Sequence, residues 1–163
     1  MAVRKVLLYP DPGLKAVCAP APEGAELARI VEDLTDTMRS FPGCVGIAAP
    51  QIGYEACVSV IDLTGHKKAP ESVHGLTVLI DPVVVSGEGT EVGREGCLSI
   101  PQLTANVRRF VDVKVQTRDE EYLFEGFEAR LAQHEIDHLS GLLFLDRVDS
   151  LTADVFPRKQ RTK

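Results

Sequence analysis

The segment best equipped for chemistry is His134-Glu135-Ile136-Asp137-His138, an HExxH pattern. Histidines four positions apart lie on one face of a helix, one turn from each other, so both imidazoles can bind the same metal ion. The side chain of Glu135 is turned about 100° from that of His134, which places its carboxylate beside the metal without ligating it. Such a carboxylate suits a general base acting on water that the metal activates. The pattern therefore predicts a metal-dependent amide hydrolase, and the alternative is two histidines packed in a core.

A catalytic site of this kind takes three protein ligands and leaves one position open. Beyond Glu135 the chain has no further glutamate and no histidine except His138, so the usual downstream ligand of HExxH peptidases is missing. The best upstream candidate is Cys97, which follows Gly96 in a polar run with glycines, where Pro101 is expected to limit further sheet pairing. A lone cysteine is more often a small buried apolar residue, and that alternative stays open. The acidic residues left downstream are Asp137, Asp146, Asp149 and Asp154.

A third segment, residues 46–53, is rich in small residues and almost uncharged. Small side chains allow the backbone of a substrate to lie along such a segment as an added strand. The side-chain amide of Gln51 can donate a hydrogen bond to a developing oxyanion. The alternative is a tight core turn in which the backbone satisfies Gln51.

Two helices are predicted to position these segments. Residues 25–40 place apolar side chains at helical spacing, with Asp33 and Asp36 on the solvent side. Residues 125–139 form the second helix, which ends at Ser140-Gly141, a glycine stop signal. The two histidines of the HExxH pattern share the apolar stripe of this second helix.

The middle of the chain is rich in β-branched residues and predicts strands that surround the second helix. This is an α+β pattern with one central helix buried among strands. The expected strands cover residues 57–61, 77–80, 83–85, 111–116 and 122–124, with a short turn over residues 118–121.

The bulk composition fits one folded domain. The chain has 163 residues and a net charge of −6, which argues against a uniformly basic surface for nucleic acid. No apolar run is long enough for a secretory signal or a membrane span. We therefore expect no membrane partner, no specific nucleic-acid partner and a cytoplasmic location of the bacterial type. The four cysteines lack CxxC pairing, which is typical of reduced thiols; they are Cys18, Cys44, Cys57 and Cys97.

Three segments together resemble the signature motifs of the peptide deformylase family. They are residues 46–51, residues 95–99 and residues 133–139, and they occur in the order of the family. The similarity extends over about residues 3–150, and three motifs together are highly specific. The resemblance implies an α+β fold with antiparallel sheets around the HExxH helix. It also implies one catalytic domain over residues 1–163, with a core at about 3–150 and a short basic tail at 151–163.

The resemblance further implies an activity, a metal and a set of site residues. Such enzymes remove the formyl group from the N-terminal formyl-methionine of newly synthesised polypeptides and release formate. They bind one Fe²⁺ per chain, which Zn²⁺, Ni²⁺ or Co²⁺ can replace. Carried over, the metal ligands are Cys97, His134 and His138, and the catalytic groups are Glu135, Gln51 and the Leu98 N–H. The substrate-binding residues are Gly46, which pairs with the substrate backbone, Ile47, Glu95, Phe127 and Leu131.

Several residues depart from the pattern of the family and leave the side-chain preference open. Cys44-Val45 adds one residue before Gly46, and Ile47 replaces the usual leucine. Arg94 stands where an acidic residue often precedes Glu95, and Arg130 occupies a normally apolar position near the methionine pocket.

Two further alternatives concern the whole protein. One is a deformylase-like hydrolase with an altered substrate. The other is a structural zinc module, which needs a fourth ligand. That ligand would come from Cys18, Cys44, Cys57, His66 or His74.

The basic residues 158–163 are expected to form a frayed end, and the alternative is a weak, transient contact with ribosomal RNA.

Overall fold

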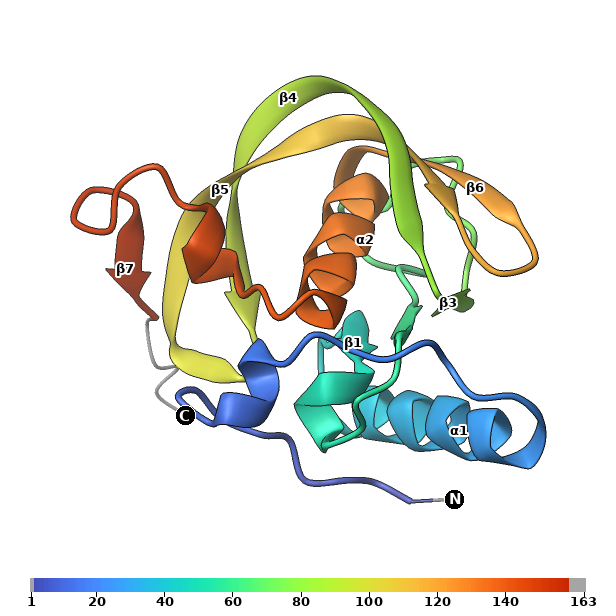
Figure 1. The fold of residues 1–163 in the computed structure, drawn as a ribbon. Coiled ribbons are helices and arrows are strands. Elements are labelled where there is room, and N and C mark those ends of the chain that lie inside the picture. The colour runs from blue at the N-terminus through green and yellow to red at the C-terminus, as the bar shows by residue number, and fades with distance from the viewer. Residues whose placement is uncertain (1, 159–163) are drawn as a thin grey trace.

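The computed structural model, which describes residues 2–158, is built around one helix, α2 (Gly126–Leu139). Two antiparallel sheets enclose this helix, and a second helix, α1 (Gly24–Ser40), lies outside the smaller sheet (Figure 1). The α+β fold with antiparallel sheets around the HExxH helix is therefore confirmed. The strands are β1 (Gly46–Ala48), β2 (Val58–Ile61), β3 (Thr77–Ile80), β4 (Val83–Cys97), β5 (Ile100–Gln116), β6 (Glu121–Glu125) and β7 (Val155–Pro157), and the 3₁₀ helices are η1 (Pro12–Lys15), η2 (Ala49–Ile52) and η3 (Phe144–Arg147).

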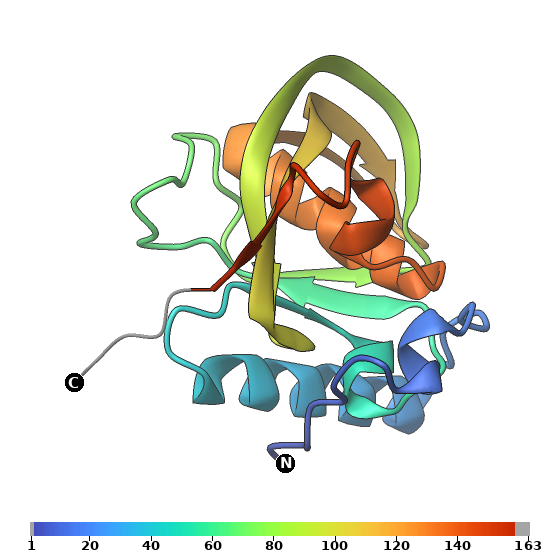
Figure 2. The same ribbon diagram turned by 90° about the vertical axis from the view of Figure 1, so that its left-hand side faces the viewer.

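The smaller sheet has the strand order β1-β2-β3 and separates the two helices (Figure 2). All four residues of β2 are buried, as expected of a central strand that is covered on both faces. Gly46 of β1 pairs with Ile61 of β2, and β1 lies at the edge of the sheet. The outer edge of β1 therefore has no strand partner within residues 2–158.

The larger sheet is a long hairpin of β4 and β5 that curves over α2, with β6 and β7 beside β5. The sequence predicted only residues 83–85 and 111–116 of this hairpin as strands. Most of β4 was missed because it is largely exposed and lacks the alternation of buried apolar residues that marks a half-buried strand.

Pairing between β4 and β5 is interrupted at Pro101, as the sequence predicted. Gly96 pairs with Thr104, whereas Cys97 pairs with Ile100, so residues 101–103 have no partner on β4. A bulge of this kind accommodates a proline without ending the strand. β5 therefore continues, and its next residues pair with β7.

The solvent-side assignment of Asp33 in α1 was wrong. Asp33 is only 1% exposed, and its carboxylate accepts hydrogen bonds from Arg4 Nε at 3.0 Å and from the hydroxyl of Tyr54 at 2.7 Å. Burial acts to raise the pKa of Asp33, but the bonds from Tyr54 and Arg4 outweigh it and lower this pKa. The N-terminal segment covers this face of α1, which a helix pattern alone does not predict.

The C-terminal segment is more ordered than the expected tail at residues 151–163. Residues 155–157 form β7, which pairs with residues 103–105 of β5, and the N–H of Arg158 donates to the carbonyl of Gln102 at 2.7 Å. The remainder of the basic segment, residues 159–163, lies outside the described residues. In the described range 2–158, no helix has the length and apolar character needed to cross a membrane.

The C-terminal end of α2 is closed at the glycine that the sequence predicted. The N–H of Gly141 donates to the carbonyl of His138 at 3.1 Å, and that of Leu142 donates to the carbonyl of Asp137 at 2.9 Å. Gly141 has a φ of 75°, the left-handed conformation that such a cap requires. An added Cβ there would lie 2.4 Å from the carbonyl oxygen of Lys15. The cap fixes the end of the helix one turn from His138.

We predict that Gly141→Ala lowers the free energy of unfolding more than Gly126→Ala does. Both glycines have positive φ, so both substitutions carry the left-handed penalty of about 1–2 kcal/mol. Only Gly141 is also packed against backbone, which adds about 1–3 kcal/mol of overpacking, whereas nothing lies within 4 Å at Gly126. Denaturant unfolding of the two variants tests this, and equal losses would contradict it.

Candidate metal centre

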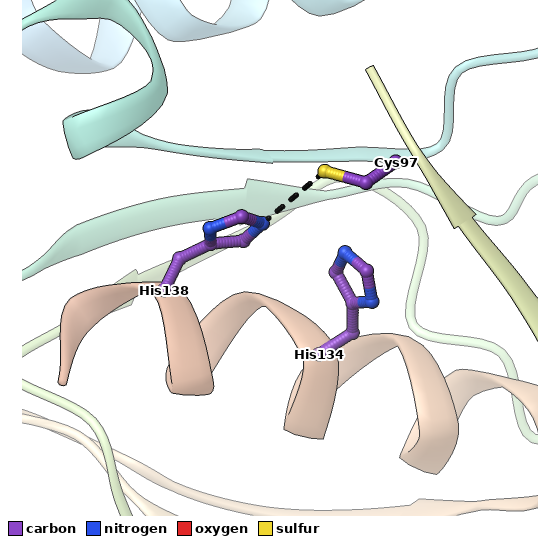
Figure 3. A group of neighbouring side chains, drawn as sticks. All are labelled: Cys97, His134 and His138. Atoms are coloured by element: carbon purple, nitrogen blue, oxygen red, sulfur yellow. Dashed lines mark hydrogen bonds between the residues drawn. The ribbon is translucent and has the colours of Figure 1, made fainter. Parts of the chain in front are cut away.

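Three metal-ligating side chains meet between β4 and α2. Cys97 ends β4, while His134 and His138 lie one turn apart on α2 (Figure 3). Their ligand atoms all lie within 4.8 Å of one another, and Cys97 Sγ is 3.5 Å from His138 Nε2. All three residues are buried. This donor set is that of a three-ligand metal site, so the residues present fit a bound metal ion.

The group contains no fourth ligand. Within residues 2–158 it is the only cluster of three or more histidine, cysteine or acidic side chains that is close enough to hold an ion. A structural zinc site is closed by four ligands, whereas a catalytic site keeps one position open. None of the alternative fourth ligands belongs to the cluster: Cys18, Cys44, Cys57, His66 and His74.

The two histidines have pKa values displaced in opposite directions. Burial, aided by the neighbouring His134, lowers the pKa of His138 well below its ordinary value, so this ring is in the neutral, ligating form. Burial also acts to lower the pKa of His134, but hydrogen bonding to Cys97 and Glu95 outweighs it and raises this pKa. Metal binding by His134 would displace its second proton.

The carboxylate of Glu95 orients His134. Its Oε1 lies 2.9 Å from His134 Nδ1, which leaves Nε2 of the ring for a metal. Arg109 donates to both Glu95 oxygens at 2.9 Å, and Arg130 donates to Oε2 at 2.7 Å. Burial acts to raise the pKa of Glu95, but Arg109 and His134 hold it well below its usual range. Glu95, expected among the substrate-binding residues, thus has both oxygens bonded within the protein.

A buried ion network that the sequence did not predict extends from Glu95. Arg109 also donates to Asp137 at 2.6 Å, and Arg147 donates to both oxygens of Asp137 at 3.0 and 2.9 Å. One signal was available in the sequence. Alternate residues of β5 from Val107 onward face inward and are apolar, except for Arg109. A charged residue at such a position needs buried partners.

The side chain of Gln51 is held in a fixed orientation. Its Oε1 accepts a hydrogen bond from the N–H of Ala48 at 2.9 Å. Its Nε2 donates to Ser99 Oγ at 3.1 Å and to Cys97 Sγ at 3.4 Å. Backbone therefore satisfies the oxygen, and the amino group is directed toward the three-ligand cluster.

The carboxylate of Glu135 lies against the backbone of Gly46. A Cβ added to Gly46 would stand 2.7 Å from Glu135 Oε2 and 2.8 Å from Leu131 Cδ1. Glu135 is only 3% exposed, and its Oε1 has no hydrogen-bond partner among the described residues. Burial, together with the charge of Glu95, raises the pKa of Glu135 to about 7 against the opposing effect of His134 and Arg109. An unpartnered carboxylate with this pKa can accept and return a proton near neutral pH.

These side chains open into a cavity of about 260 Å³. Gly46, Phe127 and Leu131 line it, together with Gln51 and Leu98. Ile47 does not line it, because its side chain is fully buried in the core beside α1. Only the backbone of Ile47 can therefore face a ligand.

Arg130 also lines this cavity, but its guanidinium is already bonded. Besides Glu95, it donates to the carbonyl of Val107 and to that of Glu91, both at 2.8 Å. Its charge is thus neutralised by Glu95, which limits what it can offer to a ligand.

Comparison with known proteins gives one consistent result. The family described as polypeptide deformylase matches residues 3–154. Peptide deformylase 2 of Vibrio cholerae is 39% identical over 164 residues, which cover 98% of this chain and 94% of that protein. The peptide deformylase of Syntrophobacter fumaroxidans is 38% identical over 100% of this chain and 96% of its own length.

Solved structures agree with these sequence matches. A peptide deformylase from Legionella pneumophila superimposes with a TM-score of 0.81 at 38% identity, over 92% of this chain and 88% of that one. The Met-Ala-Ser-bound class I type b peptide deformylase of Acinetobacter baumannii gives a TM-score of 0.79 at 30% identity, over 90% of this chain and 99% of that one.

We predict that Glu95→Gln weakens metal binding by about 10–100-fold, because His134 loses the charged partner that orients it. The matched control is Glu128→Gln. Glu128 is also fully buried and bonded to a histidine, His74 at 2.7 Å, but it is not part of the metal cluster. Both variants should be less stable, since each removes a buried charge partner. Zn²⁺ affinity measured by chelator competition should fall only in Glu95→Gln, and equal affinities in the two variants would contradict the prediction.

Proposed function

The chain belongs to the polypeptide deformylase family, and on that premise we propose which of its residues carry out the reaction of the family. The protein is a metal-dependent hydrolase that removes the formyl group from the N-terminus of newly synthesised polypeptides and releases formate. The observation that carries our assignment is the placement of Glu135 beside the three-ligand cluster in one cavity.

Cys97, His134 and His138 would hold the metal ion. A bound divalent metal supplies Lewis acidity, which makes water a stronger nucleophile at neutral pH. The chain's own contribution is to orient the ligands. Glu95 orients His134 through Nδ1, and the Gln51 amide donates to the sulfur of Cys97.

Glu135 moves the protons. Its free oxygen accepts a proton from the attacking water, and the same carboxyl then donates that proton to the nitrogen of the leaving amine. The close packing against Gly46 holds the carboxylate at the cavity wall, where the formyl group must enter.

The oxyanion that forms on the formyl oxygen needs donors. We assign this role to the Gln51 amide, which is directed toward Cys97, and to the N–H of Leu98, the residue after Cys97. The free edge of β1 at Gly46 offers backbone groups that would pair with the substrate chain. These contacts would place the formyl carbon beside the metal.

The methionine side chain would occupy the cavity between Phe127 and Leu131. Both residues line the cavity, and an apolar slot suits an unbranched thioether. Arg130 borders this slot, but Glu95 neutralises it.

We assign Fe²⁺ as the native ion, one per chain, with Zn²⁺, Ni²⁺ or Co²⁺ as replacements. A thiolate with two imidazoles suits borderline metals of this kind, which supports the choice. Metal analysis of protein purified without oxygen tests it, and a preparation that contains zinc and no iron would contradict it.

We also propose that the enzyme works in the cytoplasm, where nascent chains are made, and that the basic residues 159–163 add a weak ribosome contact. Co-sedimentation with ribosomes at low salt, with and without residues 159–163, tests the contact. An unchanged bound fraction would remove it. The deletion spares Arg158, which lines the cavity.

Glu135→Gln should keep the metal and lose turnover. The amide is isosteric but cannot accept the proton, so formate release should fall by roughly 10²–10⁴-fold. Metal content per chain and formate release are measured on the same preparation. Retention of more than about a tenth of the wild-type rate would show that another group carries the proton.

The slot should select the first side chain of the substrate. Formyl-Met peptides should exceed formyl-Asp peptides in kcat/KM by about a hundredfold or more, because an aspartate would enter an apolar slot without a free cation. Initial rates of formate release for the two peptides test this. Equal rates would show that an arginine of the cavity, Arg130, Arg94 or Arg158, offers its charge to the ligand and would favour a hydrolase with altered substrate.

A further inference from the structure

Two exposed arginines stand at the mouth of the active-site cavity, and neither takes part in the chemistry described above. Arg94 and Arg158 both line this cavity, and they come from β4 and from the end of β7. Among residues 2–158, neither guanidinium forms an ion pair with a carboxylate. This distinguishes them from Arg130, whose charge Glu95 neutralises.

The backbone of Arg158 is hydrogen-bonded, whereas its guanidinium has no hydrogen-bond partner among residues 2–158. Its N–H is bonded to the carbonyl of Gln102, directly after β7 pairs with β5. The guanidinium lies over Gly96, because a Cβ added to that glycine would meet Arg158 Nη2 at 2.0 Å. No hydrogen bond from this guanidinium to residues 2–158 is formed. Five N–H donors thus lie one residue from Cys97 with no acceptor among residues 2–158.

Arg94 is fixed beside the same strand. Its guanidinium carbon lies 4.0 Å from the centre of the Phe156 ring, which belongs to β7. Its Nε donates to Asn106 at 3.1 Å and its Nη1 to Thr104 at 3.2 Å, and both partners are neutral. Arg94 therefore has a fixed position and no carboxylate partner among residues 2–158.

We propose that Arg158 and Arg94 bind acidic side chains at the second or third residue of the substrate polypeptide. The inference rests on the proposed function. If the formyl group is held at Cys97 and the first side chain lies between Phe127 and Leu131, the rest of the peptide must leave through the mouth. An extended chain advances about 3.3 Å per residue, so its next residues pass Gly96 and the guanidinium of Arg158. The protein has a net charge of −6, but Arg94 and Arg158 make the rim of the cavity positive. This positive rim favours the binding of negatively charged peptides.

The effect should be modest and should appear in binding. An exposed ion pair changes affinity by about two- to fivefold, and salt screens it. A contact remote from the reacting bond is made equally in the ground state and the transition state, so it should alter KM and leave kcat unchanged.

The test compares formate release from formyl-Met-Ala-Glu, formyl-Met-Ala-Ser and formyl-Met-Ala-Lys, and from the same series with the charged residue second. All peptides are C-terminal amides. Formyl-Met-Ala-Ser as the free acid is added, because its terminal carboxylate offers the same chemistry as an acidic side chain. Wild type should prefer Glu over Lys by about two- to fivefold in kcat/KM at low salt, at one or both positions, and the preference should fade as salt rises.

Three variants separate charge from structure. Arg158→Glu should invert the preference for Glu over Lys, and Arg158→Lys should preserve it. Arg29→Glu, on the exposed face of α1 and outside the cavity, makes the same change in net charge and should preserve it as well. Arg94→Gln should reduce the preference without inverting it.

The outcomes separate the inference from the function on which it rests. Release of formate from every peptide, with the same Glu-to-Lys ratio in wild type and Arg158→Glu, would overturn the inference alone. A preference that only the free acid shows would assign the rim to terminal carboxylates and would also overturn it. No formate from any peptide would instead refute the proposed function.

Discussion

The carboxylate of Glu95 joins β4 to α2, and the geometry of the candidate metal centre depends on it. Two residues later in the chain, β4 ends in Cys97, while the other ligands lie on the helix. Burying a carboxylate costs several kcal/mol unless charges and hydrogen bonds compensate it. Arg109, Arg130 and His134 provide that compensation. Arg109 also donates a hydrogen bond to Asp137 of α2, which links the strand to the helix at a second point. One ion network thus sets the separation of strand and helix and also the orientation of a ligand ring.

The same network explains why α2 is polar and yet buried on nearly every side. Its faces carry the candidate metal ligands, the proposed proton carrier and ion-pair partners, and two sheets cover them. Ala129, Leu131 and Ala132 of the same helix pack into the apolar core, while specific bonds hold its polar side chains. The cap at Gly141 ends the helix at its C-terminus.

Local signals in the sequence predicted the parts of the structure that depend on neighbouring residues. The HExxH helix, its glycine stop and α1 were all predicted close to their observed bounds, because spacing and caps lie within a few residues of one another. Most of β4 and the burial of Asp33 were not predicted, because they depend on β5 and on the N-terminal segment. The motifs also indicated Cys97, yet Arg109 and Arg158 reach the site only through the pairing of β5 with its neighbours.

The proposed mechanism requires that Cys97, with two histidines, binds the metal ion. Cys97→Ser tests this requirement, since a hydroxyl is a poorer ligand than a thiolate at neutral pH. Metal per chain and formate release from formyl-Met-Ala-Ser are measured for this variant and wild type, both purified without oxygen. We expect the variant to bind metal weakly or not at all and to show no turnover. A variant that is fully loaded and fully active would contradict the ligand assignment and the mechanism built on it.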